Sequence, residues 1–360
     1  MKEHRSSDIP SFLAKDQERL TRAIRRHLPR RLTRQYLARV LGRARYAYDP
    51  DALQKALADP VWELLDRGGK RWRPVLFLLV LRLFGKDPHR FLTDAAAFEL
   101  IHTGTLIVDD VEDRSALRRG KPTLHRLFGE DIAINAGNAL YFLPLLHFLE
   151  RDDLSRQTKL GILRAAITDL LRLHAGQGTD IVWHRGLVPS TRITERQYLQ
   201  MCAYKTGCLT RLAATAAAII GGATTHQTEA LGAFAETLGV VFQIQDDLLN
   251  ITESELSKQK GLGEDITEGK RSLAVIYALQ RARPAQRKRL LTILDMHSSK
   301  QSLRNEAIAM IRETGAIERA HATMRWLFHR ARQRVDKAFP ASPAKARLHE
   351  LATFLIERDI

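Results

Sequence analysis

The apolar residues of this chain recur every three to four positions along most of its length, and this spacing limits the folds open to it. From about Asp51 onward the pattern is clear in two early stretches: Leu53, Leu57, Val61 and Leu65, then Phe91, Ala95, Phe98 and Ile101. Residues at this spacing share one face of an α-helix. Alternating strand patterns are nearly absent. The sequence therefore predicts an all-α fold.

Glycine and proline fall between the helical runs, for example at Gly68-Gly69, Gly120 to Pro122 and Gly221-Gly222. No linker rich in serine, glycine or proline divides the chain between residues 49 and 360. A length of 360 residues suits about two average domains, but one large helical unit fits it as well. We therefore expect a single helical domain over residues 49–360, preceded by a basic extension over residues 1–48.

Positive charge is concentrated in this extension. The chain has 57 Lys and Arg against 41 Asp and Glu, a net charge of +16, and residues 1–48 hold thirteen basic and four acidic residues, or +9. Such an excess suits a nucleic acid, an anionic membrane or a phosphorylated substrate as partner. Leu20, Ile24 and Leu28 recur every four residues there, so the segment suits either a membrane-surface, transit or anion-binding arm or an extension packed on the body.

The two cysteines, Cys202 and Cys208, exclude a disulfide scaffold and suit a reducing compartment. Uncharged stretches such as residues 212–225 are shorter than the ~18–20 apolar residues of a membrane span. No signal-peptide core follows the start of the chain. We expect a cytoplasmic protein, with membrane association or organellar targeting through the basic extension left open.

Four acidic residues in five positions follow the apolar run of residues 106–108. Asp109 and Asp113 lie one helical turn apart on the same face, with Asp110 alongside. Such a cluster is electrostatically costly unless a cation offsets it. Carboxylates without His or Cys suit Mg²⁺ rather than zinc. A solvated helix end is the alternative, which the preceding apolar run disfavours.

A second cluster of the same form lies 137 residues later, where Asp246 and Asn250 are one turn apart and Asp247 stands beside them. Mg²⁺ usually shares its coordination shell between a few protein carboxylates and substrate phosphates. The two clusters together therefore predict diphosphate chemistry at a multi-metal site, provided that the fold brings them face to face.

Basic residues that could bind the phosphate oxygens form four groups: Lys70 to Arg73, Arg118-Arg119, Lys205, and the glycine-containing segment from Lys260 to Lys270. Arginine binds phosphate with two parallel hydrogen bonds, whereas lysine acts as a point charge. With 57 cations in the chain, a surface role for any one group alone is an equal alternative.

In chain order these segments resemble the trans-isoprenyl diphosphate synthases of the polyprenyl synthetase family. The matching motifs are GGKRxRP at 68–74, DDxxD at 109–113 followed by LRRG, GQGxD at 176–180, YKT at 204–206 and FQxxDD at 242–247. The similarity spans residues 50 to 340 or so, leaves out residues 1–48, and is greatest to geranylgeranyl diphosphate synthases. It implies a helical bundle around a central cavity, and a homodimer.

The resemblance implies about three Mg²⁺ ions on an allylic diphosphate. Their ligands would be Asp109, Asp113 and Asp246, with Asp110 and Asp247 in support. The family's second motif often ends in Asp, where this chain has Asn250. Asn250 is therefore expected to have an auxiliary role at most.

The resemblance also implies two sets of substrate-binding residues. The allylic diphosphate would be held by Arg118, Lys205 and Lys260, with Lys270 as a further cation. Isopentenyl diphosphate would be held by Lys70, Arg73, His102 and Arg119. A histidine with its hydrogen bonds satisfied in the core is the alternative for His102. The nearby Lys258 is the alternative to Lys260 as the lysine that matches the family.

The implied reaction is head-to-tail (1'-4) condensation of isopentenyl diphosphate with an allylic prenyl diphosphate. Metal ions and cations would stabilise the departing diphosphate, and an apolar pocket would keep water from the allylic cation. Thr206 and Gln243 would stabilise that cation. The groups expected to act in catalysis are Asp109, Asp110, Asp113, Lys205, Thr206, Gln243 and Asp246.

The residues before the first aspartate cluster bear on product length. A chain growing down this helix would meet Thr105 and Gly104, one turn back. Gly104 would leave the floor open, so the product should exceed fifteen carbons, and of the deeper residues Ile101 and Phe98 the latter could stop growth. We expect a twenty-carbon product, geranylgeranyl diphosphate.

Several other functions fit parts of the sequence. A longer-chain polyprenyl diphosphate synthase or a class I terpene cyclase could use the same metal clusters, but a cyclase has no use for a second diphosphate clamp. A non-catalytic partner subunit would be expected to lose aspartates that are present here. Nucleic-acid binding would be accompanied by recognition motifs that the sequence lacks, so nucleic acid is not an expected partner. The preferred allylic primer and the pathway stay open.

Overall fold

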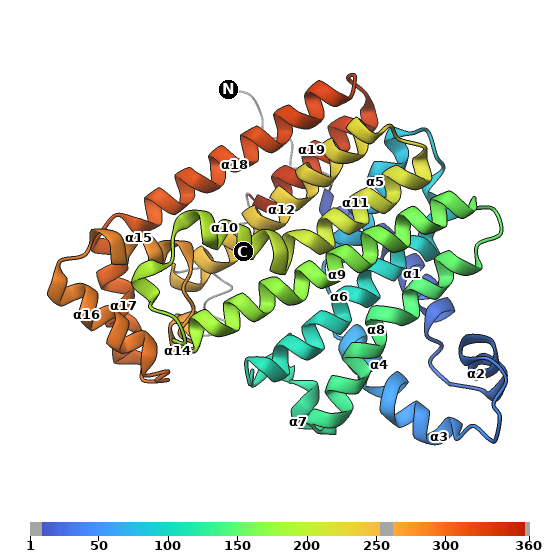
Figure 1. Cartoon of the computed structure of the whole chain (residues 1–360), viewed down its shortest axis with the longest axis horizontal. Helices are drawn as coiled ribbons and strands as arrows, with labels where there is room; N and C mark the ends of the chain where they lie inside the picture. Colours follow the sequence, from blue (N-terminus) through green and yellow to red (C-terminus); the bar gives the residue numbers. More distant parts are fainter. Residues whose placement is uncertain (1–8, 253–261, 357–360) are drawn as a thin grey trace. The chain divides into compact units, whose positions relative to one another are not determined.

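The computed structural model describes residues 9–252 and 262–356, with side-chain positions from Gln17 onward. Nearly every element in this part of the chain is a helix (Figure 1). The exception is one antiparallel pair, β1 (Leu117–Arg118) with β2 (Lys121–Pro122). The predicted all-α fold is confirmed. The central cavity stays a prediction.

The chain divides into two compact units: unit 1 is Met1–Ala165 with Ala213–Ala223, and unit 2 is Ala166–Leu212 with Thr224–Ile360. Neither boundary falls at residue 49. The predicted division into an extension and one body stays a prediction of the sequence.

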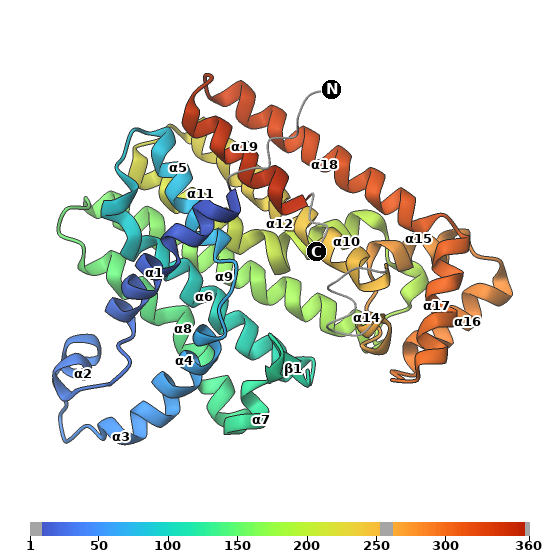
Figure 2. The same cartoon turned by 180° about the vertical axis from the view of Figure 1, so that it is seen from behind.

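Unit 1 is built around α6 (Leu92–Glu112), which packs against α1 (Ile9–His27), α5 (Trp72–Leu83) and α8 (Glu130–Glu150) (Figure 2). Its smaller elements are α2 (Arg34–Leu41), α3 (Pro50–Leu53), the π-helix η1 (Gln54–Ala58), α4 (Asp59–Asp66), the 3₁₀-helix η2 (Pro88–Phe91) and α7 (Leu124–Phe128). Two helices have residues assigned to both units: α9 (Arg156–His184) and α11 (Cys208–Gly221).

Within unit 1 the basic helix α1 is part of the core. Leu20, Ile24 and Leu28, the apolar residues of its sequence pattern, are 1%, 0% and 3% exposed. These three side chains therefore pack as expected for an extension folded onto the body. Full burial of one such side chain contributes roughly 1.5–3 kcal/mol relative to leaving it exposed.

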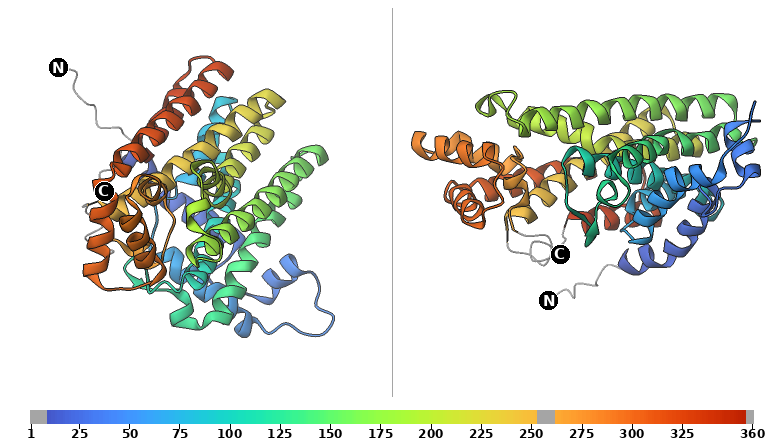
Figure 3. Two further views of the ribbon diagram at one scale, coloured as in Figure 1. Left: turned by 60° about the vertical axis from the view of Figure 1, so that its left-hand side comes forward. Right: turned by 90° about the horizontal axis from the view of Figure 1, so that it is seen from below.

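Unit 2 has α12 (Thr225–Ile251) and α18 (Ala316–Ala338) side by side along their lengths (Figure 1). The side chain of Thr224 and that of Gln227 form a reciprocal capping box at the start of α12. The other elements are η3 (Ser190–Arg192), α10 (Glu195–Cys202), the π-helix η4 (Ala203–Gly207), α14 (Glu264–Thr267), α15 (Leu273–Arg281), α16 (Pro284–Asp295), α17 (Gln301–Glu313) and α19 (Pro343–Ile356). Helices α16 and α17 pack against each other (orange in Figure 3).

Two helical segments, residues 88–112 and α8, are long and apolar enough to cross a membrane when judged by length and composition alone. Of their most apolar windows, 61% and 39% respectively is buried inside the protein. The first includes α6, the central helix of unit 1, and a buried core helix passes the same test. Helix α8 keeps large apolar side chains at the surface, among them Phe142 at 69% exposure.

Candidate functional site

In unit 1 the first aspartate cluster lies at the carboxyl end of α6, with Asp113 as the residue that ends the helix. The negative end of the helix dipole is unfavourable for carboxylates, so a cation is needed there. Arg118 supplies it: its Nε donates to Asp110 Oδ1 at 2.8 Å, and its Nη2 lies 3.4 Å from Asp109 Oδ2. The predicted grouping of Arg118 with these aspartates is therefore present within this unit.

Burial and the neighbouring charges shift the pKa of both Asp110 and Arg118. It raises the pKa of Asp110, although the charge of Arg118 opposes the shift. Burial alone would lower the pKa of Arg118, but the charges of Asp110 and Asp109 raise it overall. Asp109 is more open, with a side chain 24% exposed, whereas that of Asp110 is 2% exposed. Asp109 is thus the carboxylate better placed to meet a ligand from solvent.

The hairpin that carries Arg118 explains the spacing of the Arg-Arg-Gly motif. Arg118 pairs with Lys121, and the two residues between them, Arg119 and Gly120, have φ values of 53° and 73°. Positive φ at both central positions is the requirement of a type I′ turn, which matches the twist of paired strands. The turn directs Arg118 and Arg119 from neighbouring positions to different partners.

Arg119 reaches the glycine-rich segment before α5. Its Nη1 donates to the carbonyl oxygens of Leu64, at 3.2 Å, and Gly68. A Cβ atom at Gly69 would lie 2.8 Å from Arg119 Nη2, which could move aside, but the φ of Gly69 is 155°, a conformation that favours glycine. The segment at 68–74 and the LRRG motif are therefore in direct contact within unit 1, and their roles in binding substrate stay predictions.

His102 lies among these cations. Burial and the charges of Arg73 and Arg119 lower the pKa of His102 well below its ordinary value, so the imidazole is neutral at neutral pH. One turn earlier on α6, Glu99 is 3% exposed, and burial raises the pKa of its carboxyl group although arginine charges oppose the shift. Glu99 was not predicted, yet its position three residues before His102 places it on the same helix face.

Helix α1 fixes the cationic segment from the other side. Arg71 has φ 48°, the left-handed conformation, and its Nη1 donates to the carbonyl oxygen of Gln17 at 3.1 Å and to Thr21 Oγ1 at 2.5 Å. The Gln17 amide donates to Gly69 O at 3.0 Å. The basic extension, which the predicted chemistry does not use, therefore holds a predicted substrate-binding loop in place. Lys70 within this loop is exposed.

One prediction about the residues that control the length of the product is wrong. Gly104 does not face open space: a Cβ there would lie 2.6 Å from Gly137 O and 2.9 Å from Leu140 Cβ of α8. The glycine allows α6 and α8 to approach closely, because any side chain at 104 would meet backbone. Thr105 is half-buried, and its hydroxyl donates to His102 O at 2.8 Å.

The two deeper chain-length residues, Ile101 and Phe98, are buried. The Phe98 ring lies 5.0 Å from that of Phe77 and 6.0 Å from that of Phe148, between centroids. Phe98 thus belongs to an aromatic cluster in the core of unit 1. Its predicted role in ending chain growth stays a prediction.

In unit 2 the predicted YKT motif lies in the π-helix η4, between α10 and α11. π-helical turns inside α-helices are rare and frequent at functional sites. A Cβ at Gly176 of α9 would collide with the backbone of Tyr204, so the glycine of the GQGxD motif allows α9 to touch η4. The contact brings Lys205 Nζ to 2.6 Å from Asp180 Oδ2.

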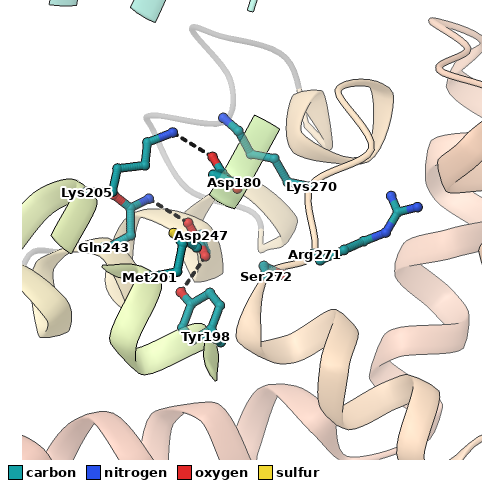
Figure 4. Close-up of a pocket in the computed structure, with 9 residues that line it drawn as sticks. All are labelled: Asp180, Tyr198, Met201, Lys205, Gln243, Asp247, Lys270, Arg271 and Ser272. Atoms are coloured by element: carbon teal, nitrogen blue, oxygen red, sulfur yellow. Dashed lines mark hydrogen bonds and ion pairs between the residues drawn. The ribbon is translucent and has the colours of Figure 1, made fainter. Parts of the chain in front are cut away.

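A series of hydrogen bonds links Thr206, Gln243 and Asp247 of unit 2, and Figure 4 shows the part of it that joins Gln243 to Asp247. Thr206 Oγ1 donates to Gln243 Oε1 at 2.8 Å, and Gln243 Nε2 donates to Asp247 Oδ1, also at 2.8 Å. Tyr198, which sequence reasoning missed, donates its hydroxyl proton to Asp247 Oδ2 at 2.7 Å. Thr206, Gln243 and Asp247 are thus brought together as predicted, and the conformation of Asp247 is fixed on both oxygens.

Several charged side chains lie around this series of hydrogen bonds. Although burial alone would raise it, Lys205 and Lys270 lower the pKa of Asp180. Burial raises the pKa of Asp247 to about 6 and that of Asp265 to about 8, despite the charge of Lys270. Lys270 Nζ lies 2.6 Å from Glu268 Oε2 and 3.4 Å from Asp265 Oδ1.

Asp180 belongs to the GQGxD motif and Asp265 to the segment from Lys260 to Lys270, but neither was predicted as a site residue. Asn250 has a structural role: its Oδ1 accepts a hydrogen bond from the backbone N–H of Asp265 at 3.1 Å. Asp246 is half-buried on the same helix. Lys260 lies outside the described residues.

The acidic residues fit magnesium by their chemistry. Among the described residues, no group of three or more His, Cys, Asp or Glu could hold a metal ion by itself. Mg²⁺ is commonly bound by one or two carboxylates together with water and substrate phosphates, rather than by an all-protein cage. Asp109 in unit 1 and Asp246 in unit 2 offer hard oxygen ligands of this kind.

Residues 54–311 match the family model described as polyprenyl synthetase. The chain is 36% identical over 296 residues to a short chain isoprenyl diphosphate synthase of Methanothermobacter thermautotrophicus. The matched region covers 82% of this chain and 88% of that protein.

Two solved structures resemble the chain over nearly its whole length. A geranylgeranyl pyrophosphate synthetase from Pyrococcus horikoshii has a TM-score of 0.81 and 27% identity, covering 97% of this chain and 99% of that one. A polyprenyl synthase from Caulobacter crescentus, complexed with calcium and isoprenyl diphosphate, has a TM-score of 0.80 and 25% identity, covering 100% of both chains.

Proposed function

The chain belongs to the polyprenyl synthetase family and is a prenyltransferase of the trans-prenyl diphosphate synthase class, and from this premise we propose that it makes geranylgeranyl diphosphate in a Mg²⁺-dependent reaction. The proposed step is head-to-tail condensation of isopentenyl diphosphate with an allylic prenyl diphosphate. The observation that carries the proposal is a partly buried arrangement in unit 2, in which Thr206, Gln243 and Asp247 are hydrogen-bonded in series and Lys205 is paired with Asp180.

Magnesium would be held by Asp109, Asp113 and Asp246, supported by Asp110 and Asp247, with about three ions per site. When bound, it would neutralise the charge that builds up on the departing diphosphate.

The chain's own residues would bind the two diphosphates and stabilise the allylic cation. Arg118 and Lys205 bind phosphate oxygens of the allylic substrate, while Arg73 and Arg119 bind isopentenyl diphosphate beside the neutral His102. Neutral His102 donates a hydrogen bond without adding to the repulsion among these arginines. The hydroxyl of Thr206 and the amide of Gln243 offer oxygen dipoles to an allylic cation.

The twenty-carbon product is supported by the names of similar proteins, a short chain synthase and a geranylgeranyl pyrophosphate synthetase. The alternatives are a longer-chain polyprenyl diphosphate synthase and a class I terpene cyclase. The arginines around His102 favour condensation over cyclisation, because a cyclase binds only one diphosphate.

The test is to incubate the purified chain with radiolabelled isopentenyl diphosphate and farnesyl diphosphate, with MgCl₂ or with EDTA, and to chromatograph the dephosphorylated products. We expect a twenty-carbon alcohol only with Mg²⁺. Asp246→Asn should lower kcat by about a hundredfold or more, and Asp152→Asn, which alters an exposed aspartate outside the predicted site, serves as the matched control. Mainly fifteen-carbon or thirty-carbon chains would refute the product, and no condensation would refute the activity.

We also propose a homodimer. Ile134, Phe142 and Leu149 lie on one face of α8 and are 40%, 69% and 46% exposed, an apolar surface of the kind that subunit contacts cover. Light scattering should give twice the mass of one chain, and Phe142→Glu should shift the protein toward monomer. Cys202 and Cys208 are buried and not joined in a disulfide, which supports a cytoplasmic location, and cell fractionation tests this.

A further inference from the structure

Arg271 is a charged residue in the core of unit 2, next in sequence to a predicted substrate-binding lysine. Its side chain is 1% exposed. It lines a pocket together with Lys270 and Asp180 (Figure 4). The proposed function gives Arg271 no role. A buried charge is costly unless it is paired and hydrogen-bonded, so the partners of Arg271 indicate what it does.

The guanidinium of Arg271 binds three different parts of unit 2. Its Nε donates to Ser190 Oγ of η3 at 2.9 Å. Its Nη1 donates to Gly269 O, and its Nη2 donates to Asp295 Oδ1 of α16. A planar guanidinium holds its acceptors in a fixed arrangement, which the flexible ammonium group of a lysine does not. Arg271 therefore fastens residues 268–272, which connect α14 to α15 and which we name the lysine link, to η3 and α16.

The backbone of the lysine link is also confined by its neighbours. Gly269 has a φ of 71°, and the backbone N–H of Lys270 donates to Asp265 O at 2.9 Å, at the end of α14. A Cβ at Gly269 would lie 2.9 Å from Leu294 O and 3.0 Å from His184 O. The link therefore lies directly against α16 and the end of α9, and close packing holds it on that side.

Lys270 extends from the link in another direction than Arg271. Figure 4 shows Lys270 directed toward Asp180 and Arg271 directed away from it. The two residues share one planar peptide unit, so an arginine held at three points fixes where the side chain of Lys270 begins. Lysine carries its charge on a flexible four-carbon chain. The position of its ammonium group therefore depends on how well its backbone is held.

A contribution to stability alone does not account for a charge at this position. Replacing a buried ion pair by apolar residues of similar volume is often neutral or stabilising, so the core does not require a guanidinium there. The carboxylate of Asp295 has a side chain 56% exposed, and water screens its attraction to Arg271. What the guanidinium adds, and an apolar side chain would lack, is a fixed geometry at three points.

We propose that Arg271 is a positioning residue, which holds Lys270 where its ammonium group meets the diphosphate of the allylic substrate. This inference rests on the proposed function, in which Lys270 is one of the cations for that diphosphate. Arg271 itself does not touch the substrate, because its three nitrogens donate within the protein and its side chain points away from Asp180. A displacement of about 1 Å in a site of this kind can cost about a hundredfold in rate.

The test is a double-mutant cycle of Arg271→Met and Lys270→Met. Each full-length variant is titrated calorimetrically with farnesyl S-thiolodiphosphate, an unreactive analogue of the allylic substrate, in the presence of MgCl₂. We expect each single variant to raise the Kd about tenfold. The double variant should raise it no further, because Arg271 acts through Lys270. Single effects that multiply to about a hundredfold would overturn the proposal, as would an unchanged Kd in Arg271→Met.

Two further variants separate geometry from charge and from folding. Arg271→Lys keeps the positive charge but not the three hydrogen bonds, so it should bind as weakly as Arg271→Met, and full recovery would contradict the proposal. Ser190→Ala removes one acceptor and should raise the Kd about threefold. Lys270→Met should abolish this effect, which keeps the test decisive where Arg271→Met does not fold. The matched control, Arg281→Met, removes an exposed guanidinium that donates to Thr314 O and should stay within about twofold.

Steady-state kinetics separates failure of this inference from failure of the proposed function. Arg271→Met should raise the KM for the allylic substrate and leave that for isopentenyl diphosphate, whose predicted residues lie in unit 1, nearly unchanged. A parent that neither binds the analogue nor makes product refutes the proposed function and this inference with it. An active parent with an additive cycle refutes this inference alone. A single cooperative thermal transition for each variant shows that folded proteins are compared.

Discussion

The hydroxyl group of Tyr198 donates a 2.7 Å hydrogen bond to Oδ2 of Asp247, while the Gln243 amide donates to the other oxygen. Tyr198 is fully buried, so it has no contact with bulk solvent. On the proposed function, Tyr198 would therefore be a positioning residue, which acts on a bound diphosphate only through the carboxylate that it orients.

Tyr198→Phe removes this hydrogen bond and keeps the ring. Losing an outer-shell partner of a metal-binding carboxylate commonly costs about 10–100-fold in metal affinity or activity. We expect the Mg²⁺ concentration for half-maximal rate to rise within that range, with little change in the KM for isopentenyl diphosphate. Tyr277→Phe removes a buried hydroxyl that bonds to Thr323 instead and is the control. Equal effects of the two variants would show a merely structural role.

Thr21→Val tests whether α1 positions the substrate-binding loop. The change removes the oxygen that accepts from Arg71 Nη1 and preserves the shape of the side chain. A hydrogen bond to a charged group contributes about 1.5–3 kcal/mol, so the loop should become less ordered. We expect a rise of about tenfold in the KM for isopentenyl diphosphate, with kcat nearly unchanged. Thr228→Val, whose hydroxyl bonds only to its own helix at Thr224 O, should leave both constants unaltered.

Gly104→Ala distinguishes close helix packing from an open floor. The new methyl group would lie 2.6 Å from Gly137 O, so α6 and α8 must separate, and overpacking of this kind costs about 1–3 kcal/mol. Urea unfolding should show that loss. Gly178→Ala is the matched control, because its Cβ meets nothing within 4 Å and alanine favours a helix. A variant of full stability with a shorter product would restore the open-floor interpretation.

Much of this arrangement could be predicted from the sequence because its motifs lie on long helices. The spacing of Asp109 and Asp113 and that of Gln243 and Asp247 hold wherever the helix goes, so the local geometry follows from sequence alone. The roles of Gly104 and Thr21 could not be predicted in this way. Each depends on a partner from another helix, Gly137 or Arg71, and no local pattern identifies such a partner.

His27 should make the stability of the protein depend on pH below neutrality. Its Nε2 donates to Thr93 O at 2.7 Å, and its ring centroid lies 5.0 Å from that of His147. Burial, with the charge of His147 adding to it, lowers the pKa of His27 from 6.5 to about 4. Between these values the unfolded chain binds a proton that the folded chain does not, so stability falls as the pH falls from about 6.5 to 4 and is constant above that range.

The measurement is urea unfolding at pH 7.5 and pH 5.0 for the parent and for His27→Gln. One pKa unit corresponds to about 1.4 kcal/mol. Between pH 7.5 and pH 5.0 the free energy of unfolding of the parent should therefore fall by about 2 kcal/mol more than that of the variant. His226→Gln, which alters an exposed histidine, should leave the parent's pH dependence in place. If the parent and His27→Gln lose the same stability, the neutral, buried imidazole is not what couples the docking of α1 to pH.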